Sequence, residues 1–132
     1  MEPKQLIPDL ELCKRLKELG WKGETYFRWE RDIFDDSPII TTGVLPSSRI
    51  IALAPTSEEL GEILRPNYIG DIYHVVLRLM DDKYLWTACE EDTKSGELNS
   101  IDAIDPEEKE VNVRAKMVIW LIENGHLKLE TA

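Results

Sequence analysis

Histidine and cysteine are scarce in this sequence of 132 residues, which contains two of each. The histidines, His74 and His126, and the cysteines, Cys13 and Cys89, lack the paired spacing of a zinc site. Two cysteines in a chain without secretory features indicate reduced thiols rather than a disulfide framework. Glycine-rich phosphate-binding loops, a Gly-x-Ser-x-Gly nucleophile elbow and an EF-hand loop are also absent from the sequence. We therefore expect no metal, no cofactor and no catalytic residue.

Long apolar runs are missing as well. The longest, residues 117–122, is far shorter than the ~18 residues that indicate a membrane-spanning helix. The N-terminus has no uncharged apolar segment followed by a cleavage site, so no signal peptide is expected. These features predict a cytoplasmic protein without membrane contact. The length and the 42% hydrophobic content predict a single domain, residues 1–132, with a core of its own.

Negative charge is concentrated in one part of the chain. The sequence has 26 acidic and 16 basic residues and a formal charge of −10, whereas residues 1–34 sum to zero. Residues 90–110 carry a net charge of −7 from two lysines and nine acids: Glu90, Glu91, Asp92, Glu97, Asp102, Asp105, Glu107, Glu108 and Glu110. Such a surface repels phosphates, so direct nucleic-acid binding is not expected. A basic partner, a divalent cation or water alone can face it.

Local patterns predict an α+β fold, with a small antiparallel sheet of three to five strands packed against a long C-terminal helix and shorter helices. Asp9 is suited to cap a helix over residues 10–19 that ends at Gly20. The segment Thr56-Ser57-Glu58-Glu59 is a capping box that opens a helix through Leu64. Strands are expected at residues 25–31, 39–42, 49–54, 71–80, 83–91 and 97–103.

The C-terminal helix has the strongest local signals. Asp105 is its expected N-cap, Pro106 its first residue, Glu108 the partner in a capping box and Gly125 its end. Residues 117–122 are apolar on every side of this helix, so it must be covered on more than one side. A sheet with a second helix satisfies this requirement, and so does a homodimer through the C-terminal helix.

One strand pair brings potential chemistry together. If two residues, Asp81-Asp82, connect residues 71–80 and 83–91, then His74 lies opposite Cys89. In the same register Leu77 lies opposite Trp86. A thiol beside an imidazole can ionise and act as a nucleophile. A connection one residue longer sets His74 against Glu90 instead.

Two further groups are candidates for function. Glu58 and Glu62 lie one helical turn apart, and with the loop pair Asp35-Asp36 they are candidates to bind a divalent ion or to act as acid and base. Trp21 and Tyr68 fall in expected loops, where exposed aromatic side chains can anchor a partner.

The order of the segments resembles a known family. The helix at residues 10–20, the strand Tyr26-Phe27-Arg28-Trp29, the box at residues 54–64 and the helix at residues 114–125 are similar to those of small uncharacterised proteins of bacteriophages, prophages and other mobile elements. The resemblance covers nearly the whole chain. It implies an intracellular setting, and it brings no established activity and no catalytic residue.

The leading hypothesis is a non-enzymatic accessory protein that binds a protein partner through an acidic surface. The candidate partner surface comprises Glu90, Glu91, Asp92, Glu97, Asp102, Trp21 and Tyr68. One alternative is a small enzyme that uses Cys89 with His74 or a carboxylate-bound divalent metal. The other is an acidic mimic of nucleic acid that occupies the basic cleft of a host protein, which requires the acids of residues 90–110 to form one face.

Overall fold

The computed structural model describes residues 2–21, 23, 25–42, 48–64, 68–69, 72–78, 85–92, 94–125 and 127, with backbone alone at 63–64, 68–69 and 72–78. Its elements, in chain order, are α1 (Pro3–Leu6), α2 (Leu10–Glu18), β1 (Phe27–Arg31), β2 (Pro38–Thr42), β3 (Ile50–Ala54), α3 (Ser57–Leu64), β4 (Tyr68–Ile69), β5 (Ile72–Arg78), β6 (Trp86–Asp92), β7 (Leu98–Ser100) and α4 (Glu110–Glu123). The α+β class is confirmed.

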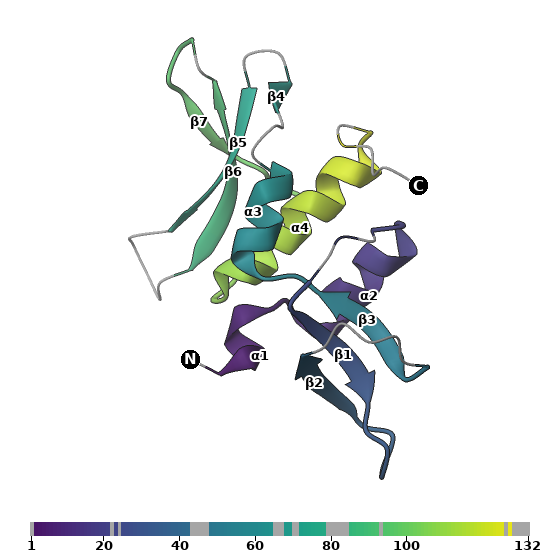
Figure 1. Cartoon of the computed structure of the whole chain (residues 1–132). Coiled ribbons are helices and arrows are strands. Elements are labelled where there is room, and N and C mark those ends of the chain that lie inside the picture. The colour runs from purple at the N-terminus through teal and green to yellow at the C-terminus, as the bar shows by residue number, and fades with distance from the viewer. Residues whose placement is uncertain are drawn as a thin grey trace.

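The strands form two antiparallel sheets, one with the order β2-β1-β3 and one with the order β4-β5-β6-β7. Helices α3 and α4 lie side by side between the two sheets (Figure 1), and α2 packs on β3. The chain passes directly from β3 into α3, which carries it from the first sheet to the second. The strands are therefore divided between two sheets on either side of the helices.

Helix α4 is at the centre of the core. It contacts α2, α3, β5 and β6. Its buried residues are Val111, Asn112, Val113, Ala115, Met117, Val118, Ile119 and Leu121. The expectation that this helix is covered on several sides is confirmed, and elements of the same chain provide the cover. A homodimer through this helix stays a prediction.

The predicted start of α4 is wrong. The helix begins at Glu110, and Lys109 rather than Asp105 is its N-cap residue. The preceding segment pairs with the beginning of β6: Trp86 N–H donates to Glu107 O at 2.8 Å, and Glu107 N–H donates to Trp86 O at 3.0 Å. This pairing satisfies the backbone groups that an earlier helical turn would use, so a tertiary contact overrides the local capping signal. The predicted end is confirmed, since Gly125 has a φ of 75°.

The short helix α3 begins as predicted. Thr56 N–H donates to Glu59 Oε1 at 2.9 Å, and Glu59 N–H donates to Thr56 Oγ1 at 3.3 Å. This reciprocal pair is the predicted capping box. Leu60 in the same helix is fully buried and joins the core around α4.

Strands β5 and β6 pair as predicted, but their register differs from the one predicted for a two-residue connection. His74 pairs with Glu90, Val75 with Cys89 and Leu77 with Thr87. This is the register expected for a connection one residue longer, because each added residue moves every cross-strand pair by one position. The predicted turn at Asp81-Asp82 lies outside the described residues.

Candidate functional site

The acidic segment does not form one face. Glu90, Glu91 and Asp92 follow one another along β6, so Glu91 lies on the opposite face of the sheet from the other two. Glu97 precedes β7 and Asp102 follows it, and both side chains are exposed. The nucleic-acid mimic required all of these acids on one surface, and this geometry does not support it.

Part of the same segment is neutralised by cations of α4. Lys116 Nζ lies 2.8 Å from Glu107 Oε1, and Arg114 Nε lies 2.7 Å from Glu110 Oε1. Both ion pairs are partly buried; the first ties the segment that precedes α4 to the helix, and the second lies within the first turns of α4. These two acids therefore contribute less free negative charge than the sequence count indicates.

The expectation that Trp21 is an exposed anchor is wrong. After α2, Gly20 takes a φ of 93°. Gly20 N–H donates to Lys17 O, and Trp21 N–H donates to Leu16 O, both at 3.0 Å. This Schellman arrangement folds Trp21 back onto the helix, where it is 7% exposed in the core cluster with Leu16. An apolar residue directly after a helix-ending glycine is the sequence signal for this burial. The side chain of Tyr68, in β4, lies outside the described residues.

The Cys89–His74 pair does not form. Cys89 pairs with Val75, so positions 74 and 89 belong to opposite faces of the sheet. Cys89 is buried, and burial raises the pKa of its thiol, an effect that a hydrogen bond with Ser100 only partly offsets. A thiol with a raised pKa stays protonated at neutral pH and is a poor nucleophile.

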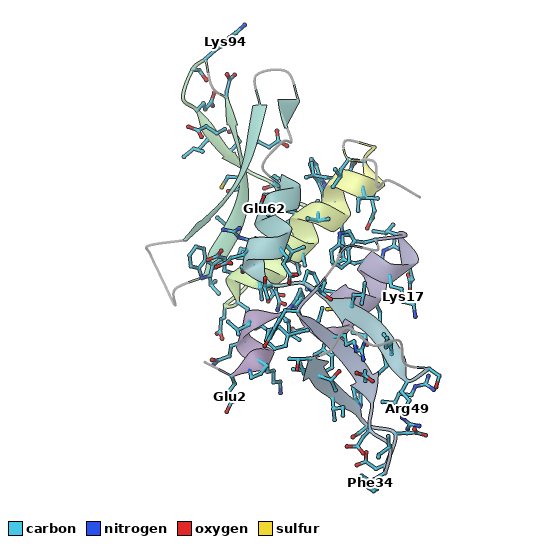
Figure 2. The ribbon with its side chains drawn as sticks, in the orientation of Figure 1. Glu2, Lys17, Phe34, Arg49, Glu62 and Lys94 are labelled. Atoms are coloured by element: carbon cyan, nitrogen blue, oxygen red, sulfur yellow. The ribbon has the colours of Figure 1, made fainter. Side chains whose placement is uncertain are left out.

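The carboxylates of the metal hypothesis lie apart. Glu58 and Glu62 are exposed on α3. Asp35 and Asp36 lie beside Phe34 in the connection between β1 and β2, which Figure 2 shows at the far end of the three-stranded sheet from Glu62. Across the described residues, no group of three or more histidine, cysteine, aspartate or glutamate side chains is placed to hold a metal ion. No described helix is long and apolar enough to cross a membrane.

The structure reveals a candidate that the sequence reasoning missed. The β1–β2 turn, residues 32–37, presents Ile33, 70% exposed, and Phe34, 91% exposed, at its tip (Figure 2). They are the two most exposed large apolar side chains of the described residues. The signal was an Ile-Phe pair inside a run of aspartates, because a turn leaves such side chains without a core to enter.

Hydrogen bonds link the side chains of the β1–β2 turn to its own backbone. Phe34 N–H donates to Asp32 Oδ1 at 2.7 Å. The Ser37 hydroxyl and N–H donate to Asp35 Oδ1 at 2.7 and 3.0 Å and lower the pKa of this carboxyl. Asp36 takes a φ of 59°, which aspartate tolerates better than most residues. The side-chain oxygens of the turn therefore organise its own backbone.

Arg49 attaches the turn to the sheet. Its Nε donates to Arg31 O at 3.0 Å, and its Nη2 donates to Asp32 O at 2.7 Å. Nη2 also lies 2.8 Å from Asp36 Oδ1. These contacts come from the residue that directly precedes β3, so they join both ends of the turn to the neighbouring strand. The result is a hydrogen-bonded turn that exposes an aromatic and an aliphatic side chain among three carboxylates, of which Asp36 is paired with Arg49.

Comparisons of the chain with protein-family models, with curated proteins and with solved structures find no match.

Proposed function

We propose that this chain is a non-enzymatic accessory protein that binds a protein partner through the β1–β2 turn. The observation that carries the proposal is the 91% exposure of Phe34 in a turn held by side-chain hydrogen bonds. Leaving an aromatic ring in water is unfavourable, and a partner pocket that covers it gains its apolar area. Because the turn is already ordered, little conformational entropy is lost on binding.

The charge around the turn defines the kind of partner. Asp32, Asp35 and Asp36 flank the apolar pair, so the complementary surface is an apolar pocket with a basic rim. The same carboxylates disfavour insertion into an anionic lipid surface. The proposal thus keeps the acidic interaction surface expected from the sequence but locates it at residues 32–36 rather than at residues 90–110.

Differential affinity capture tests the proposal. Tagged wild type, Phe34→Ser and Leu98→Ser are used to capture proteins from a bacterial lysate at low and moderate salt. Leu98 is the matched control, since it is also an exposed apolar residue but lies on the other sheet. We expect one basic protein that wild type and Leu98→Ser recover and Phe34→Ser loses, with less recovered as salt rises.

The purified partner then provides the quantitative test. Loss of an aromatic anchor should weaken the affinity about 30-fold, equivalent to ~2 kcal/mol. Circular dichroism of Phe34→Ser must match the wild type, which is expected because the side chain supports no core packing. Equal affinity for wild type and Phe34→Ser would overturn the proposal, as would recovery of the same proteins by all three baits.

A further inference from the structure

A cavity of about 310 Å³ lies between α2 and β3. Its lining residues are Cys13, Lys17, Trp21, Ile50, Ala52 and Leu53. Of these six lining residues, five have largely apolar side chains and Lys17 is charged. This volume is within the range of small-molecule sites and about twice the ~150 Å³ cavity that accommodates benzene in a protein core.

Small side chains and an irregular strand create the cavity. Cys13 and Ala52, each 1% exposed, are the small residues between helix and sheet. The pairing of β1 with β3 shifts between Trp29–Ala52 and Glu30–Ile50, so Ile51 is the extra residue of a β-bulge. A bulge leaves its extra residue outside the regular ladder and bends the strand, and bulges often lie beside functional sites.

The bulge positions a cation at the mouth of the cavity. The carbonyl oxygen of Ile51 accepts a hydrogen bond from Lys17 Nζ at 3.0 Å. An ammonium group has three N–H donors, so two remain for a ligand. Figure 2 shows Lys17 on the side of α2 near β3.

A second, more open hollow of about 450 Å³ adjoins this mouth and shares Lys17 and Ile50 with the cavity. It adds the residues Lys14, Glu18, Arg31 and Ile51. Glu18 is paired with Arg15 at 3.1 Å, and Lys14 with Glu11 at 3.4 Å. Within the described residues, no carboxylate lies at ion-pair distance from Lys17 or Arg31, so the mouth has a local excess of positive charge.

We propose that the cavity binds an amphiphilic carboxylate of about ten to twelve non-hydrogen atoms, with its apolar part against the half-buried Ile50 and Leu53 and its carboxylate at Lys17. The size follows from the cavity volume, and the charge follows from the mouth. The Cys13 thiol does not oppose an anion, because burial raises its pKa to about 12 and keeps it neutral. The net charge of −10 repels anions only weakly at this site, since salt screens it beyond about 8 Å at physiological ionic strength.

Calorimetry and NMR with decanoate as the probe test this assignment, which does not depend on the β1–β2 turn. We expect one site per chain and chemical-shift changes at the lining residues of α2 and β3. Decanol, which has the same chain length without the charge, should bind at least about tenfold more weakly. Lys17→Met should weaken decanoate binding by a similar factor and leave decanol binding unchanged.

Two more variants separate this site from surface adsorption. Lys94→Met removes a lysine from the tip beyond β6, remote from the cavity (Figure 2), and should bind decanoate like the wild type. Ile50→Trp narrows the mouth and should abolish binding. If this variant fails to fold, the comparison of Lys17→Met with Lys94→Met still tests the proposal. Equal affinity for decanol and decanoate, more than one molecule bound per chain, or undiminished binding by Lys17→Met would overturn the proposal. Binding of an acidic peptide but not of decanoate would overturn it as well.

Discussion

Asn112 is a buried polar residue that joins two helices. It is 3% exposed on α4, its Oδ1 accepts the Asp9 N–H at 2.9 Å, and its Nδ2 donates to Asp9 Oδ2 at 3.0 Å. Asp9 is the N-cap residue of α2, as predicted, but its carboxylate caps no N–H of that helix. The Asp9 carboxylate binds Asn112 of α4 instead, so Asp9 joins the start of α2 to α4.

Removing this amide should be costly. Asn112→Ala leaves the Asp9 N–H without its acceptor in a part-buried position, and we expect a loss of about 1–3 kcal/mol in the free energy of unfolding. Urea denaturation measures the loss. The control is Asn124→Ala, whose exposed amide donates to Trp120 O and should change the stability by about 0.5 kcal/mol or less. Equal effects of the two substitutions would contradict this assignment.

The carboxylate of Asp9 makes stability depend on pH. Partial burial acts to raise its pKa, but Lys109, whose Nζ lies 2.9 Å from Oδ1, and Asn112 outweigh this effect, and the pKa is lowered. A lowered pKa in the folded state stabilises the protein above the ordinary aspartate range, and this contribution is lost as the pH falls through and below that range.

We therefore expect Asp9→Asn to lose about 0.5 kcal/mol at pH 7 and little at pH 3, because the carboxyl is largely exposed and solvent screens the pair. Urea denaturation of wild type and variant at both pH values measures the difference. A variant effect that is larger at pH 3 than at pH 7 would show that the sign is wrong.

Helices α3 and α4 cross at a glycine. A Cβ atom at Gly61 would lie 2.6 Å from Arg114 Nη1, which itself donates to Ser57 O at 3.1 Å. The absence of a side chain at position 61 thus lets the α4 arginine reach the first turn of α3. Arg114 is also paired with Glu110 one turn earlier, so its position is determined from both helices.

A double-mutant cycle tests this contact. Gly61→Ala gains about 0.5–1 kcal/mol of helix propensity but displaces Arg114, so in the wild-type background we expect a change near zero. In an Arg114→Ala background the same substitution should stabilise the protein by about 0.5–1 kcal/mol, because the methyl group then has room. Chemical denaturation of the four proteins measures the coupling. If Gly61→Ala has the same effect on stability in both backgrounds, the contact with Arg114 is not the reason that position 61 lacks a side chain.

The main core cluster around α4 links the two sheets, and the three-stranded sheet also has a smaller cluster of its own, formed by Ile7, Cys13, Phe27, Ala52 and Ala54. The main cluster around α4 includes Leu16 and Trp21 from the α2 region, Leu60 from α3 and Ala88 from β6. The three-stranded sheet reaches this core through α2, and the four-stranded sheet contacts α4 directly. A change at the centre should therefore affect both sheets together.

Met117→Ala tests that dependence. Met117 is fully buried in α4, and its truncation should cost about 2–5 kcal/mol. Amide hydrogen exchange should show protection lost to the same extent in β1 and in β6, because one transition unfolds both sheets. Leu98→Ala, at an exposed site on β7, is the control and should leave both sheets protected. Loss of protection in one sheet alone would contradict a single cooperative unit.

Features with a short-range cause were predictable. The α3 capping box, the end of α2 and the end of α4 depend on hydrogen bonds between residues a few positions apart, and the sequence contains those residues. The cover around α4 was also predictable, since a helix that is apolar on every side has only one favourable environment.

Other features depend on contacts between distant segments. The pairing of Glu107 with Trp86 moved the start of α4, and the register of β5 with β6 separated Cys89 from His74. Local patterns in the sequence thus predict the α+β class and most of its elements. Which acids share a face, and how exposed Trp21 and Phe34 are, depends on the folded chain. Burial is a property of the assembled chain, because a side chain leaves water only when another segment covers it.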